Sequence, residues 1–119
     1  MFYYPTKDIK KDCEPIIFIH GTGMDHSVWT LPVRYFLRKK REVLAIDLPG
    51  HGKSSGKLIS SISGFSNKLF NFLDNHSISN FSVVGHSMGS LIALEMASSQ
   101  PHRIKAMSLI GTAFPMQVN

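Results

Sequence analysis

Ser87 stands at the centre of a glycine–x–serine–x–glycine pattern, with Gly85 two residues before it and Gly89 two residues after it. The residues at 81–85 are typical of a buried strand, and those at 88–99 are typical of a buried helix. So sharp a turn strains the backbone at its vertex, and only small neighbours can approach so closely. A nucleophile elbow has this form and holds a serine hydroxyl out above a sheet. The pattern therefore predicts that Ser87 is a nucleophile.

Two backbone amides are candidates for stabilising negative charge beside that serine. The N–H of Met88 belongs to the first turn of the predicted helix, where amides lack an intrahelical acceptor, and it would point at a developing oxyanion. The loop His20-Gly21-Thr22-Gly23 follows a predicted strand and could aim another N–H into the same site. The alternatives are a capped helix with closely packed glycines and an ordinary strand-to-helix turn. Composition alone produces the pattern around Ser87 about once in ten such sequences, so the prediction depends on its context.

Strands and helices alternate along the chain in the way that would position these loops. The expected strands lie at 15–20, 42–47, 81–85 and 104–110, the expected helices at 27–41, 60–76 and 88–99, and a loop at 111–119. Such alternation predicts right-handed crossovers and a parallel sheet with helices on both faces, a three-layer α/β sandwich. Sites in such sheets lie at the carboxyl ends of the strands.

Three segments, HGTGMDHSVW, DLPGHGKS and GHSMGS, resemble motifs of the α/β-hydrolase family in order and spacing, particularly its bacterial esterase-, lipase- and peptidase-like members. The resemblance extends from about residue 15 to the end of the chain. It implies that Ser87 is the nucleophile and that the backbone amides of Thr22 and Met88 form the oxyanion hole. The residues to which it gives structural roles, in the elbow and in the neighbouring loops, are Gly85, His86, Gly89, His20, Gly21 and Asp47.

The activity that the resemblance implies is hydrolysis of an ester, amide or related bond through an acyl-enzyme, without a cofactor or metal. The family places its acid and then its histidine after later strands. After Ser87 this sequence holds one carboxylate, Glu95, inside a predicted helix, and one histidine, His102, at the far end of that helix. Neither is placed to serve, and the family's cap and last two strands are also missing. We therefore expect residues 1–119 to be the N-terminal part of a single domain that is inactive alone.

Two other interpretations remain open. The chain could be a non-catalytic remnant or a half that a partner completes, because the strand from Lys105 to Ile110 would then present an unpaired edge for self-association or for a complementing segment. Nucleotide binding is less favoured: GHGKSSG contains the Gly-Lys-Ser of a P-loop, but Asp47 stands where that loop requires its first glycine.

Other histidines could replace the missing base. His26, beside Asp25, His51 and His86 all lie in or next to loops on the expected edge of the sheet. Adjacent Asp25 and His26 cannot easily form an acid–histidine hydrogen bond, and the elbow should turn His86 away from the site. We expect these histidines to shape the pocket or support the structure. No histidine spacing typical of a metal site is present.

Composition limits the class of partner. The chain has 119 residues, 43% of them hydrophobic, and a formal charge of +5. Its densest basic run, 38–41, ends a predicted helix, where cations complement the dipole, and no aromatic residues are interleaved with it as single-strand binding would require. A single cysteine, Cys13, favours a reducing compartment. With no signal-peptide pattern and no bilayer-length apolar run, we expect a cytoplasmic protein without nucleic-acid or membrane partners.

Overall fold

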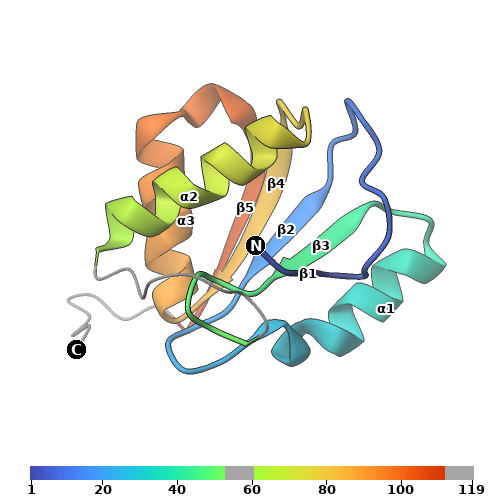
Figure 1. Ribbon diagram of the computed structural model, residues 1–119, viewed down its shortest axis with the longest axis horizontal. Coiled ribbons are helices and arrows are strands. Elements are labelled where there is room, and N and C mark those ends of the chain that lie inside the picture. The colour runs from blue at the N-terminus through green and yellow to red at the C-terminus, as the bar shows by residue number, and fades with distance from the viewer. Residues whose placement is uncertain (53–60, 112–119) are drawn as a thin grey trace.

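The computed structural model describes residues 1–52 and 61–111, which form one open sheet with helices on both faces (Figure 1). The end of the glycine-rich loop, the first residue of the helix predicted at 60–76 and most of the loop predicted at 111–119 lie outside these residues. The three-layer α/β prediction is confirmed.

Five strands pair in the order β1-β3-β2-β4-β5. Their bounds are β1 Tyr3–Tyr4, β2 Ile16–Ile19, β3 Val43–Ile46, β4 Phe81–His86 and β5 Ile104–Ile110. The four predicted strands are parallel, and β1 adds to the β3 edge in the antiparallel sense. Two residues carry no periodic pattern, so β1 was not predictable. The loops after β2, β3 and β4 consequently open on one edge of the sheet.

Helices cover the two faces of the sheet unequally. Short 3-10 helices η1 (His26–Trp29) and η2 (Pro101–Arg103) accompany three α-helices: α1 (Thr30–Arg38), α2 (Ile62–Asn75) and α3 (Met88–Ser99). On one face, Trp29 and Val33 pack with Phe18 and Ala45. On the other, α2 and α3 lie side by side over a larger apolar cluster that includes Ile17 (Figure 1).

The helix predicted at 27–41 is divided and shorter in the structure. Asp25 caps η1 by accepting a hydrogen bond from the Ser27 N–H at 2.8 Å. The α1 helix then ends at Arg38, because Lys40 takes a positive φ of 58° and the N–H of Arg41 returns to the Phe36 carbonyl. The predicted helix was too long because a positive φ is uncommon for a residue other than glycine and leaves no sequence signal.

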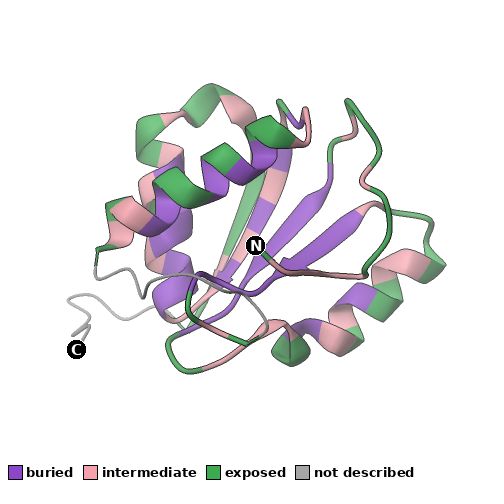
Figure 2. Ribbon diagram, viewed as in Figure 1, coloured by how far each residue is buried: buried purple, intermediate pink, exposed green. Residues whose placement is uncertain are grey.

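Burial is concentrated in the central strands. Every residue of β2 and β3 is buried, as their continuous apolar sequences predict. The outer strand β5 is mostly exposed, including Met107 at 40% and Ile110 at 45% (Figure 2). Within the described residues β5 pairs with β4 alone, so its other edge is open.

Candidate active site

The turn that holds Ser87 has the strained geometry of an elbow. Strand β4 ends at His86, α3 begins at Met88, and Ser87 between them has φ 56° and ψ −118°. A non-glycine residue in such a conformation costs about 1–3 kcal/mol. Three hydrogen bonds hold it: the Ser87 N–H donates to the Ile110 carbonyl at 3.0 Å, and the Ser87 carbonyl accepts from the N–H and the hydroxyl of Ser90, at 2.9 Å and 2.5 Å. The side chain remains partly exposed.

The two glycines of the pattern are required by close backbone contacts. A Cβ on Gly85 would overlap the carbonyl of Gly89, and a Cβ on Gly89 would overlap the carbonyl of Ile19 at the end of β2. Helix α3 therefore starts directly against the neighbouring strand. Any side chain at either position would push the first turn of α3 away from the sheet.

The loop after β2 lies against the elbow. A Cβ built on Gly21 would come 3.1 Å from the Ser87 Cβ, so the two backbones are nearly in contact. The Thr22 hydroxyl donates to the Met88 sulfur at 3.0 Å. The structure thus brings together Ser87, Thr22 and Met88, the three residues that the sequence analysis assigned to the chemistry.

His20 is a buried support of this loop. Its Nε2 accepts a hydrogen bond from the Leu48 N–H at 3.0 Å, so its Nδ1 carries the hydrogen and donates to the Gly21 carbonyl at 2.7 Å. Burial lowers the pKa of His20 below its ordinary value of 6.5. The neutral tautomer therefore connects the loop after β2 with the loop after β3.

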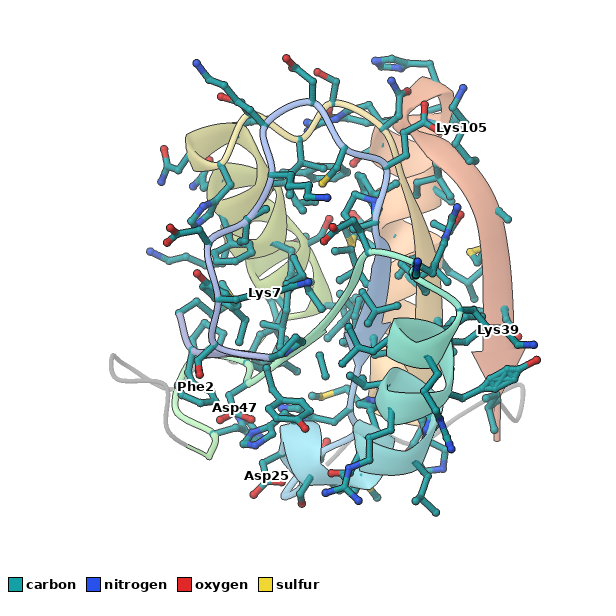
Figure 3. The ribbon with its side chains drawn as sticks, turned by 90° about the vertical axis from the view of Figure 1, so that its right-hand side faces the viewer. Phe2, Lys7, Asp25, Lys39, Asp47 and Lys105 are labelled. Carbon is teal, nitrogen blue, oxygen red and sulfur yellow. The ribbon has the colours of Figure 1, made fainter. Side chains whose placement is uncertain are left out.

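An acid–histidine pair that the sequence analysis missed lies on the same edge. The Nδ1–H of His26 donates to Oδ1 of the fully buried Asp47 at 2.9 Å, and the backbone N–H of His26 donates to the same oxygen at 2.7 Å. Figure 3 shows Asp47 beside Phe2, with Asp25 at the same end of the sheet and Lys105 at the opposite end. The pair was missed because only adjacent Asp25 was considered as a partner. The sequence places both residues at the carboxyl ends of predicted strands, but their contact also requires β3 to lie beside β2.

The other histidines that the sequence analysis considered, and Glu95, have other surroundings. The His51 ring lies 5.2 Å from the His20 ring, and the His86 ring lies 6.4 Å from Trp29. Glu95 is in the middle of α3, and His102 precedes β5. Because β5 is parallel to β4, His102 lies at the amino end of the sheet, about 20 Å of strand away from the edge that carries Ser87.

One group of side chains has a spacing that a metal ion could use. Asp25, His26 and Asp47 offer ligand atoms within 4.8 Å of one another, the one such group in residues 1–52 and 61–111. Each already has a protein partner. The Ser27 hydroxyl and N–H hydrogen-bond to Asp25 and hold the pKa of its carboxyl below the ordinary value, while His26 and Asp47 bind each other. The absence of a metal stays a prediction.

The fold and these motifs define a class of protein. Residues 14–119 match the family model of the alpha/beta hydrolase fold. The chain belongs to the α/β-hydrolase family.

The chain is also similar to individual proteins and to solved structures. The chain is 35% identical over 100 residues to a dihydrolipoyllysine-residue acetyltransferase component of the acetoin cleaving system from Pseudomonas putida, a match that covers 83% of this chain and 27% of the relative. It is 31% identical over 91 residues to a pimeloyl-[acyl-carrier protein] methyl ester esterase from Legionella pneumophila, covering 76% of this chain and 35% of the esterase. Among solved structures, a bacterial membrane phospholipase A superposes with a TM-score of 0.79 at 28% identity, covering 90% of this chain and 35% of that one.

The chain therefore spans about a third of the length of these relatives. In the part of the chain that the structure describes, none of the helices combines the length and the apolar character needed to cross a membrane.

Proposed function

We propose that this chain supplies the nucleophile and the oxyanion hole of a serine hydrolase that acts on an ester, amide or related bond of a small molecule. The observation that carries the proposal is the strained backbone of Ser87 between β4 and α3, with the Gly21 backbone packed against it. Strain of this kind is retained where a function requires it. The similarity to a methyl ester esterase supports an ester as the bond that is hydrolysed.

The proposed reaction uses Ser87 and two amides. The Ser87 oxygen attacks the substrate carbonyl carbon as its proton passes to a general base, and the resulting oxyanion accepts hydrogen bonds from the N–H groups of Thr22 and Met88. Collapse of the tetrahedral intermediate returns the proton to the leaving alcohol or amine and leaves an acyl-enzyme. Water, deprotonated by the same base, then releases the acid and restores Ser87.

The general base and its acid partner are proposed to lie outside residues 1–119. Glu95 is within α3 and His102 is at the opposite end of the sheet, so neither reaches Ser87. A serine without a base is a poor nucleophile. We accordingly treat residues 1–119 as the N-terminal part of a single α/β-hydrolase domain, inactive alone, and infer a cytoplasmic location from the single Cys13.

A second proposal concerns the open edge of β5. Its apolar Met107 and Ile110 are exposed and no described strand pairs beyond it. An unpaired edge of this kind is a template for another strand. We propose that the isolated 119-residue chain self-associates there, and that in the complete protein a further strand takes this place.

The test of the hydrolase proposal is removal of the Ser87 hydroxyl in the full-length protein. Ser87→Ala should lower kcat/KM for p-nitrophenyl acetate by at least about 10³-fold and abolish labelling by a fluorophosphonate. Ser98→Ala, an exposed change in the same helix, is the matched control and should retain activity. Unchanged hydrolysis by Ser87→Ala would contradict the proposal that Ser87 is the nucleophile.

A further inference from the structure

The loop that carries Thr22 is attached at both of its ends to two consecutive residues after β3. At its start, His20 accepts a hydrogen bond from the Leu48 N–H. At its other end, the ring and the backbone N–H of His26 both donate to Asp47. Between these points, the Met24 N–H donates to the Gly21 carbonyl at 3.2 Å and closes a turn around Thr22.

The Asp47 end of this arrangement is tightly packed. The carboxylate is fully buried, and a Cβ on Gly52 would overlap its Oδ2, so the loop after β3 lies directly against it. The Asp47 N–H donates to the Phe2 carbonyl at 3.0 Å. The His26 ring is held from other sides by Phe2, at 5.1 Å between ring centroids, and by Tyr4, stacked at 5.6 Å.

The other side chains of the loop do not fix Thr22 in this way. The Asp25 carboxylate accepts hydrogen bonds from Ser27, within η1, and the Thr22 hydroxyl donates to the Met88 sulfur, which is a weak acceptor. Thr22 and Gly23 are themselves exposed. The position of the Thr22 N–H therefore depends on the two ends of the loop, and the His26 end has two charge-assisted bonds to one buried carboxylate.

We infer that His26 and Asp47 are positioning residues, which hold the Thr22 amide where it can bind the oxyanion. The inference rests on the proposed function of Ser87 and Thr22. An oxyanion donor acts only from a fixed position near 3 Å from the charge that develops, and a shift of about 1 Å can cost about 10²-fold in rate. Neither His26 nor Asp47 is proposed to touch the substrate.

The experiment compares His26→Ala with His26→Asn in the full-length protein. The asparagine amide nitrogen occupies the place of the histidine Nδ1 and can still donate to Asp47, whereas alanine cannot. His102→Ala, at the opposite end of the sheet, is the matched control. Asp47→Asn is a secondary variant, since changing a buried carboxylate can prevent folding.

Two measurements are made on each folded variant. The first is the NMR order parameter of the Thr22 backbone amide, which reports how rigidly that amide is held on the ps–ns timescale, without any reaction. The second is saturable phosphonylation of Ser87 by a fluorophosphonate, which separates the maximal rate, kinact, from the half-saturating concentration, KI.

The expected result is a loss of order and of rate in His26→Ala. The Thr22 order parameter should fall from about 0.85 to below about 0.6, and kinact should fall between about tenfold and 10²-fold with KI changed less than about twofold. His26→Asn should recover most of both values, and His102→Ala should equal the parent. A role confined to stability would lower the fraction of folded protein and leave kinact of that fraction unchanged.

Each contrary result has a distinct meaning. A Thr22 amide that stays ordered in His26→Ala overturns the inference, whether or not Ser87 reacts, and so does an unchanged kinact despite a disordered loop. A third result is possible: Thr22 loses order in His26→Ala, but the parent protein shows no labelling at Ser87. In that case His26 does position the loop, while the proposed function fails, and the catalytic part of the inference fails with it.

Discussion

The hydroxyl of Thr22 donates a hydrogen bond to the thioether sulfur of Met88, with 3.0 Å between Oγ1 and Sδ. The two residues are 66 positions apart in the sequence, and the bond joins the loop after β2 to the first turn of α3. Both amides assigned to the oxyanion hole thus belong to residues whose side chains are already in contact. This side-chain bond couples the loop after β2 to the start of α3.

The first prediction concerns this bond. Met88→Leu keeps the apolar volume and removes the acceptor, so Thr22→Val should cost less stability in the leucine background than in the parent. We expect a coupling free energy of about 0.5 kcal/mol, measured by urea unfolding of the four proteins. Met107→Leu, on exposed β5, is the control and should show no coupling to Thr22→Val. Strictly additive effects at position 88 would contradict the prediction.

The second prediction concerns Gly89. In Gly89→Ala the new methyl group would overlap the Ile19 carbonyl, which is fixed backbone of β2. We expect a loss of about 1–3 kcal/mol in the free energy of unfolding, together with lower labelling of Ser87 because the elbow shifts. Ser98→Ala in the same helix is exposed and should change stability by less than about 0.5 kcal/mol. A fully stable Gly89→Ala would show that α3 does not start against β2.

The third prediction concerns pH. Burial lowers the pKa of His20 in the folded protein below the ordinary 6.5 that applies when the chain is unfolded. The unfolded state therefore takes up the proton first as pH falls. This contribution to stability is complete above about pH 6.5 and decreases below it, by at most about 1.4 kcal/mol per pH unit.

The measurement for this third prediction is the free energy of unfolding at pH 7.5 and 5.5. His20→Gln should lose stability at pH 7.5 and show a smaller difference between the two pH values than the parent. His102→Ala should keep the parent's difference, since His102 is exposed. An identical pH dependence in His20→Gln would exclude His20 as its source.

The fourth prediction concerns the edge of β5. The isolated 119-residue chain should sediment as oligomers at tens of micromolar, and the double variant Ala106→Lys with Ser108→Lys should shift it toward monomer, because charges block edge-to-edge pairing. Leu31→Lys, which changes a 75% exposed residue on α1, is the control for removing surface apolar area in general. A monomeric parent chain, or an equal effect of Leu31→Lys, would argue against self-association through β5.

The sequence predicted most of the fold because its signals are local. The ranges of α3 and β5 match the predicted ones, and α3 ends just before Pro101, which cannot continue a helix. The sharp turn at Ser87 could be predicted from Gly85 and Gly89, which lie within two residues of it. Strand β1 and the division of η1 from α1 were missed, because they depend on pairing with β3 and on the Asp25 cap.

The His26–Asp47 pair could not be predicted by the same means. It requires β3 to lie directly beside β2, an adjacency that the sheet order provides and the alternation of strands and helices does not. Adjacent residues in sequence, Asp25 and His26, suggested the wrong partner. Contacts of this kind follow from strand order, so they enter only with the three-dimensional structure.

The hydrogen bond from the Ser87 N–H to the Ile110 carbonyl attaches the elbow to the last residue of the most exposed strand. Local opening free energies are smallest where few apolar contacts protect the backbone. When the carboxyl end of β5 frays, the elbow loses a bond that holds its vertex in a strained conformation. The strained backbone conformation of Ser87 is thus thermodynamically linked to local opening at the carboxyl end of β5. A strand that pairs with the outer edge of β5 would disfavour this opening and would hold Ser87 in place without contacting it.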